Sequence, residues 1–117
     1  MRGISCAILF GSRATGTTHA KSDTDIALIT DHPLTPRETA SIAYVLSEEI
    51  ATTVEVIDVR IAPPALLRSI ARDGVLLYER EPRIFARFRM YAFKRYMEAK
   101  PLFALRRASR DTFTAAV

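Results

Sequence analysis

Four short apolar segments alternate with segments of helical spacing, and this alternation constrains the fold more than any other feature. The strand-like segments are SCAILF (5–10), DIALIT (25–30), TVEVIDV (53–59) and VLLY (75–78). Apolar residues recur at helical spacing after the second, third and fourth of them. The sequence therefore predicts an α/β protein, a sheet with helices packed on it.

The ends of the first two helices carry clear signals. Thr35 is the predicted N-cap of the first, because Pro36 suits the first helical position and Glu38 completes a capping box. The prolines of 62–64 open the second helix, and Asp73-Gly74 is its predicted end.

A third, longer helix is predicted after Pro82. Its apolar residues at helical spacing are Phe85, Phe88, Ala92, Tyr96 and Ala99. Proline lacks a backbone donor, so Lys100-Pro101 is the expected end, and residues 102–117 are expected to be partly disordered or ordered by a partner. One layer of helices is expected at this chain length. We divide the chain into a core, 1–80, and a C-terminal helix with a basic tail, 81–117, within the same domain.

Size and composition bound the class of protein. A chain of 117 residues, 49% hydrophobic and 26% charged, is typical of one soluble globular domain. No apolar run approaches the roughly 18–20 residues that cross a membrane, and the N-terminus does not resemble a signal peptide. The single cysteine, Cys6, allows no internal disulfide and is expected in a buried strand. A cytoplasmic protein is the expectation.

The formal charge of +4 conceals an asymmetry between the two parts of the chain. Residues 1–79 hold 7 Lys and Arg against 10 Asp and Glu, whereas residues 80–117 hold 10 against 3. A basic end on an acidic body favours an anionic partner, either nucleic acid or an acidic protein surface. A solvated helix face explains the charge equally well.

Two acids at the start of the second strand are candidate functional residues. Asp23 and Asp25 are one residue apart, so on a strand both would face the same side, where their like charges require a cation. Mg²⁺ suits such a pair, since it binds carboxylates together with substrate phosphates. Gly11-Ser12 follows the first strand, and a short helix beginning there would offer donors to phosphate. Arg13 is a further candidate phosphate contact, although a solvated arginine is as compatible with its position.

The segments 9–14 (LFGSRA) and 22–26 (SDTDI) together resemble the signature of the polymerase-β-like nucleotidyltransferases. Most of the remaining chain resembles their minimal branch, the MNT proteins, notably VEVIDVRIAPPALLRSIARDGVLLYE and FARFRMYAFKRYMEAKPL. The resemblance implies a small mixed β-sheet backed by helices, and transfer of a nucleoside monophosphate from a triphosphate to a hydroxyl. It also implies an antitoxin of a type VII-like pair, partnered with a HEPN-domain ribonuclease toxin.

The family has a third carboxylate on a neighbouring strand, and Glu55 occupies the matching position, where many relatives have Asp. Glu55 and Asp58 differ by an odd number and so face opposite sides of a strand. Glu55 lies between two valines, where an unpaired acid is costly, whereas Asp58 is expected to reach water. Glu55 is therefore the choice, with Asp58 as the alternative.

The resulting hypothesis is a Mg²⁺-dependent adenylyltransferase. ATP would bind against Gly11, Ser12 and Arg13, and Asp23, Asp25 and Glu55 would be the catalytic carboxylates and metal ligands. The predicted acceptor is a hydroxyl of the HEPN toxin, most simply of a tyrosine. Two alternatives stay open, namely nucleotide transfer to RNA such as a tRNA 3′ end, and inhibition of the toxin by binding alone. Direct nucleic-acid binding is less favoured, because no RNA-binding module is recognisable.

Overall fold

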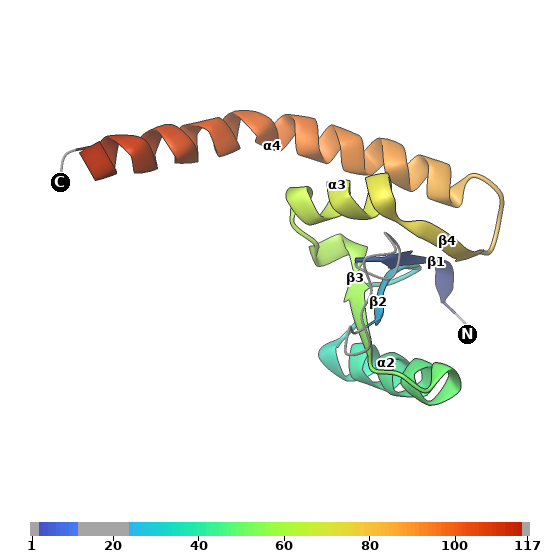
Figure 1. The fold of residues 1–117 in the computed structure, drawn as a ribbon. Coiled ribbons are helices and arrows are strands. Elements are labelled where there is room, and N and C mark those ends of the chain that lie inside the picture. Colours follow the sequence, from blue (N-terminus) through green and yellow to red (C-terminus); the bar gives the residue numbers. More distant parts are fainter. Residues whose placement is uncertain (1–2, 12–23, 116–117) are drawn as a thin grey trace.

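A computed structural model describes residues 3–11 and 24–115, with side chains up to residue 108. The elements in chain order are β1 (Ile4–Phe10), β2 (Thr24–Thr30), α2 (Pro36–Ile50), β3 (Val54–Asp58), the short 3-10 helix η1 (Val59–Ile61), α3 (Pro64–Asp73), β4 (Val75–Glu79) and α4 (Ile84–Ala115) (Figure 1). Each predicted strand forms, and its ends differ from the prediction by one residue at most.

The four strands form one mixed sheet in the order β3-β2-β1-β4. β1 lies between β2 and β4 and is antiparallel to both, whereas β2 and β3 are parallel. The crossover between the parallel strands is made by α2, as a parallel pair requires. A small mixed sheet backed by helices is the architecture that the resemblance implied.

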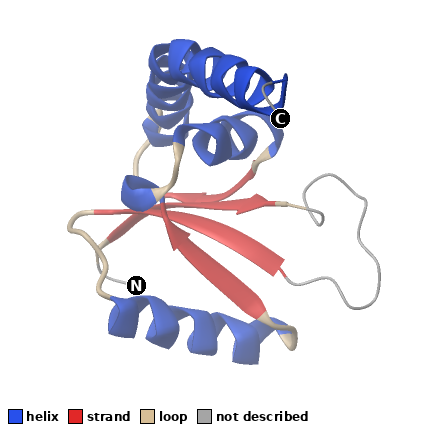
Figure 2. Cartoon of the chain, turned by 90° about the vertical axis from the view of Figure 1, so that its left-hand side faces the viewer, coloured by secondary structure: helices blue, strands red, loops and turns tan. Residues whose placement is uncertain are grey.

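Helices cover both faces of the sheet, so the prediction of a single helical layer is wrong. α2 packs on one face, and α3 and α4 pack on the other (Figure 2). The reason lies in β1 and β2, where residues from both faces are buried. A strand that is apolar on both faces needs a covering layer on each.

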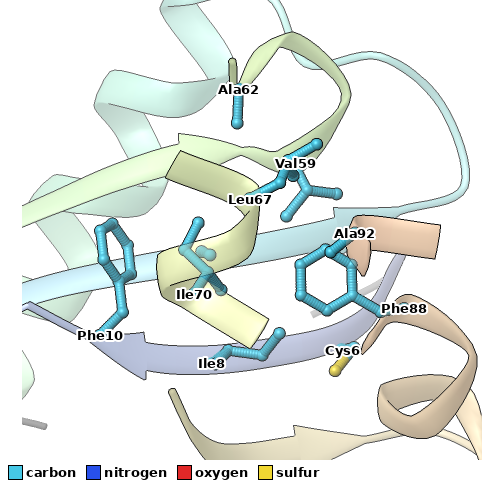
Figure 3. Packing of buried hydrophobic residues seen from close by; sticks show 10 residues of the cluster. Cys6, Ile8, Phe10, Val59, Ala62, Leu67, Ile70, Phe88 and Ala92 are labelled. Atoms are coloured by element: carbon cyan, nitrogen blue, oxygen red, sulfur yellow. The ribbon is translucent and has the colours of Figure 1, made fainter. Parts of the chain in front are cut away.

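The larger core lies between the sheet and the α3–α4 layer. Its central side chains are Cys6, Ile8 and Phe10 from β1, Leu67 and Ile70 from α3, and Phe88 and Ala92 from α4 (Figure 3). Cys6 is fully buried, as expected, and burial together with the nearby Glu79 carboxylate raises the pKa of its thiol to about 11. The thiol is therefore protonated at neutral pH.

Local signals determine the ends of α2 and α3. The Thr35 hydroxyl accepts a hydrogen bond from the Glu38 backbone N–H, and the Glu38 carboxylate accepts one from Thr35 N–H, both at 3.1 Å, which confirms the capping box. α3 ends at Gly74, as predicted. A Cβ at Gly74 would lie 2.2 Å from the Ile70 carbonyl oxygen and 2.6 Å from Ile8 Cγ2, so only glycine fits against the sheet here.

α4 is longer than predicted, because the expected stop at Lys100-Pro101 does not occur. The helix continues through Pro101 to residue 115, so the segment that was expected to be partly disordered or ordered by a partner is helical as far as that residue. An internal proline costs a helix about 3 kcal/mol. Packing across it favours continuation here, since the ring centroids of Tyr96 and Phe103 are 5.7 Å apart and the Arg68 guanidinium lies over the Tyr96 ring. None of the described helices is long and apolar enough to span a membrane.

Candidate active site

β1 and β2 bring the glycine turn and one acid of the D-x-D pair together. Asp25 is the second residue of β2, and the antiparallel register pairs it with Phe10, the last residue of β1. Gly11 follows directly and so lies beside Asp25. Three other predicted site residues, Ser12, Arg13 and Asp23, lie outside the residues that the structure describes.

The contact between Gly11 and Asp25 requires a glycine. Gly11 has a φ of 80°, a conformation that L-residues with a side chain rarely adopt. A Cβ at this position would lie 2.3 Å from Asp25 Oδ2, closer than any van der Waals contact allows. Sequence reasoning explained Gly11 by the turn and by close approach to a ligand, whereas the structure adds a second reason, the Asp25 carboxylate itself.

Glu55 lies next to Asp25 on the adjacent strand. The parallel register pairs the two residues directly, and paired residues of neighbouring strands point to the same face. That face is the one covered by α3 and α4, because Ala27 and Ile57, each two residues further along, pack in the larger core. The structure thus brings Gly11, Asp25 and Glu55 together at one end of the sheet.

The burial of the two acids of β3 is the reverse of what the sequence suggested. Glu55 is exposed, and Asp58, expected to reach water, is only 3% exposed. The Asp58 carboxylate accepts hydrogen bonds from the backbone N–H groups of Leu34 and Arg60, both at 3.0 Å. It therefore caps η1 and fixes the loop that enters α2, a structural task that the sequence did not reveal.

Asp58→Asn is expected to reduce stability and to leave the chemistry of each folded molecule intact. An amide keeps one acceptor oxygen and turns a donor toward the second N–H, so the free energy of unfolding should fall by about 1–3 kcal/mol. Thermal or urea unfolding measures this change. Asp31→Asn, which removes an exposed carboxylate held by Arg80, is the control and should change stability little. Equal stability of Asp58→Asn and wild type would contradict the capping role.

Asp25 and Glu55 are suitable ligands for a hard divalent cation. Carboxylate oxygens from adjacent strands, on one face, form the kind of donor set that Mg²⁺ takes together with substrate phosphates. Among residues 3–11 and 24–115, no three His, Cys, Asp or Glu side chains lie close enough to hold a metal ion by themselves. Asp25 and Glu55 are thus the two of the three predicted ligands that lie within the described residues.

Two of the larger cavities lie away from these carboxylates. One, of about 370 Å³, is lined by Gly3, Thr30, His32 and the start of α2, at the opposite end of β1 from Gly11. The other, of about 430 Å³, lies between η1 and α4. Neither cavity is lined by Gly11, Asp25 or Glu55, so cavity size alone does not locate the site.

Carboxylates on adjacent strands beside a glycine turn are typical of the active sites of enzymes that transfer phosphoryl or nucleotidyl groups. Residues 2–83 match the polymerase beta nucleotidyltransferase family, and the chain belongs to that family. No curated protein is significantly similar in sequence to the chain.

Solved structures share the fold over almost the whole chain. A toxin–antitoxin complex with AMP-PNP contains a chain that is 25% identical, with a TM-score of 0.81 over 97% of this chain and 89% of that one. A mutant MntA–HepT-type toxin–antitoxin complex matches at 26% identity and a TM-score of 0.78 over 96% and 86% of the two chains. A third match is the structure of a tri-AMPylated Shewanella oneidensis HEPN toxin in complex with an MNT antitoxin. The sequence identity is 22% and the TM-score 0.74, over 97% of this chain and 86% of that one.

Proposed function

We propose that this chain is the antitoxin of a HEPN toxin–antitoxin pair and that it inactivates the toxin by transferring AMP from ATP to a tyrosine hydroxyl. The observation that carries the proposal is the register that aligns Asp25 with Glu55 beside Gly11. Membership of the nucleotidyltransferase family supports transfer of a nucleotide. The similar complexes, one with AMP-PNP and one with an AMPylated toxin, support ATP and the HEPN partner.

The reaction forms one bond and breaks another at the α-phosphorus of ATP. The acceptor hydroxyl attacks that phosphorus, its proton passes to solvent, and the bond to the β-phosphate breaks so that pyrophosphate leaves. Gly11, Ser12 and Arg13 would hold the phosphates, and Asp23, Asp25 and Glu55 would hold Mg²⁺. The ion would neutralise the charge that develops on the phosphate oxygens and favour ionisation of the attacking hydroxyl.

The proposed ligands of nucleotide and metal all lie in one of the two parts of the chain. Residues 1–80 contain every proposed ligand of nucleotide and metal, and we propose that 81–117, which include α4, belong to the same domain. Positioning and electrostatics account for most of the catalysis of such reactions, so a few side chains on a small sheet suffice. Because the reaction consumes ATP, we place it in the cytoplasm.

The test is to incubate the purified protein with its proposed partner, a HEPN toxin from the same organism, in the presence of ATP and Mg²⁺. The intact mass of the toxin should rise by one or more AMP-sized increments, and omission of Mg²⁺ should prevent the rise. Added phosphate charge and bulk on the toxin would exclude RNA by repulsion and by steric overlap.

Two other outcomes would replace the proposal. A toxin that is silenced without a change in mass would show inhibition by binding alone. Labelled AMP on RNA instead of on the toxin would show an RNA nucleotidyltransferase, which the 10 basic against 3 acidic residues of 80–117 also favour.

Glu55→Gln tests whether Glu55 or Asp58 is the third carboxylate of the site. The amide keeps the size of the side chain but loses the charge, so AMP transfer should fall at least about 100-fold, roughly the loss of one electrostatic contribution to the transition state. Stability should stay close to that of wild type, since Glu55 is exposed. The rate of toxin labelling and the unfolding temperature are the measurements. A variant that is destabilised but fully active would reverse our assignment of Glu55 and Asp58.

A further inference from the structure

α4 has two apolar stripes, and the protein itself covers only one of them. The inner stripe consists of Phe85, Phe88, Ala92, Tyr96, Ala99 and Phe103. The first three pack in the larger core, and the Tyr96 ring lies under Arg68 of α3. The outer stripe consists of Ala86, Met90, Phe93, Met97 and Ala104. Its intervals of four, three, four and seven residues keep these side chains along one side of a helix, turned away from the inner stripe.

The large side chains of the outer stripe are strongly exposed. Met90 is 74% exposed, Phe93 65% and Met97 44%. Single exposed apolar residues are ordinary, but a stripe at heptad spacing is the pattern that packs against another helix. The spacing of the outer stripe therefore indicates that its partner is a helix.

A cavity beside the outer stripe offers a place for an anchoring side chain. Its volume is about 350 Å³, and it lies between α3 and α4, lined by Arg68, Ala71, Arg72, Arg89 and Phe93. Arg68 lies over the Tyr96 ring, 4.7 Å from its centroid, and Arg72 is held by Asp73 at 3.0 Å. The arginines bring positive charge to the lining of the cavity, which favours a partner with acidic residues next to its anchor.

The charge along α4 identifies the kind of helix that fits. Residues 84–108 contain seven Lys and Arg and one acid, Glu98. Helical spacing places Arg89 and Lys100 along one edge of the outer stripe and Lys94 along the other. Pairing with α4 of a second copy would oppose like charges along both edges, which disfavours self-association.

The shape of the molecule also leaves α4 accessible. The 32 residues of the helix correspond to about 48 Å at 1.5 Å per residue, close to the 53 Å longest dimension of the molecule. Its C-terminal part projects beyond α3 and the sheet (Figure 1). A partner helix could thus lie along α4 without covering the end of the sheet where Gly11 and Asp25 meet.

We infer that the outer stripe of α4, with the adjoining cavity, is the docking surface for an amphipathic helix of the HEPN toxin whose apolar stripe is bordered by acidic residues. The identity of that partner rests on the proposed function. Docking there would hold the toxin by a surface separate from the nucleotide site, so an acceptor hydroxyl on another part of the toxin could reach Asp25.

The test measures binding of the purified toxin by calorimetry, with Phe93→Glu as the principal variant. A charged side chain at the centre of an apolar contact should raise Kd at least about 30-fold, the effect of losing an interface hot spot. Tyr44→Glu is the matched control, because Tyr44 is an equally exposed aromatic, at 68%, on α2 at the other face of the sheet. The double variant Arg89→Glu, Lys100→Glu should also weaken binding, and the Kd of wild type should rise with salt.

The outcomes separate this inference from the proposed function. Equal toxin affinity of Phe93→Glu and wild type would overturn the docking surface even if AMP is transferred. Weakened binding by Phe93→Glu with no AMP transfer by wild type would support the surface and overturn the reaction. A wild-type dimer that Phe93→Glu dissociates, seen by light scattering, would assign the stripe to a second copy instead. Because the changed residues are exposed, thermal unfolding should be unaffected in every variant.

Discussion

Asp25→Asn should lower the rate of AMP transfer by at least about 1,000-fold, equivalent to about 4 kcal/mol of transition-state stabilisation. Asp25 lies against Gly11 and is aligned with Glu55, so it is the described carboxylate that joins the proposed phosphate-binding turn to the second acid. Asparagine keeps the shape of the side chain but loses the charge that holds a divalent cation. The initial rate of toxin labelling, followed by intact mass, measures the effect.

Glu81→Gln provides the control for this change. Glu81 is exposed and follows β4, whose last residue, Glu79, pairs with Cys6 near the start of β1. The control therefore removes one negative charge from the end of the sheet opposite the site and should retain wild-type activity. Full activity of Asp25→Asn would remove Asp25 from the site, provided that the toxin used is the natural partner.

Gly11→Ala should reduce transfer at least about 100-fold although it adds only one methyl group. That methyl would lie 2.3 Å from Asp25 Oδ2, so either the carboxylate or the turn must move. Displacement of a catalytic group by as little as 1 Å can cost about 100-fold in rate. Binding of a non-hydrolysable ATP analogue, measured by calorimetry, should weaken in parallel, because the turn is also the proposed phosphate contact.

Gly3→Ala is a closely matched control for Gly11→Ala. Both glycines have a positive φ, 85° at Gly3 and 80° at Gly11, so both substitutions carry a similar backbone strain of about 1–2 kcal/mol. At Gly3 the added Cβ would meet only His32, at an ordinary 3.5 Å. Equal loss of stability in the two variants with loss of activity only in Gly11→Ala would attribute the effect to contact with Asp25. Equal activity would mean that Gly11 serves only the turn.

The choice between the two acids of β3 rested in part on an expectation of burial that is wrong. Glu55 was preferred because an acid between two valines is expected to be buried, yet Glu55 is exposed and Asp58 is buried. Position relative to the family pattern and the observed register support Glu55, whereas burial does not. Asp58 is tolerated in the interior because two backbone N–H groups satisfy it.

Features that depend on nearby residues could be predicted from the sequence alone. The strands are short apolar runs ended by glycine or polar residues, and their predicted limits hold to within one residue. The capping box of Thr35 and Glu38 needs only four consecutive residues, and the end of α3 needs only Gly74. The proposal that the G-S and D-x-D segments bind phosphate and metal is equally local, since it rests on the residue types and their spacing.

Features that depend on residues distant in sequence were decided by the tertiary structure. Register between strands determines that Asp25 meets both Gly11 and Glu55, and no local pattern specifies that register. The second helical layer exists because both faces of β1 and β2 must be buried. α4 continues past Pro101, and the turns that precede this proline are held on α3, where Arg68 lies over the Tyr96 ring, a contact that helix propensity does not include. Burial and pairing are properties of the folded chain, and they leave Glu55 exposed beside Asp25, whereas Asp58 is buried and holds the fold together.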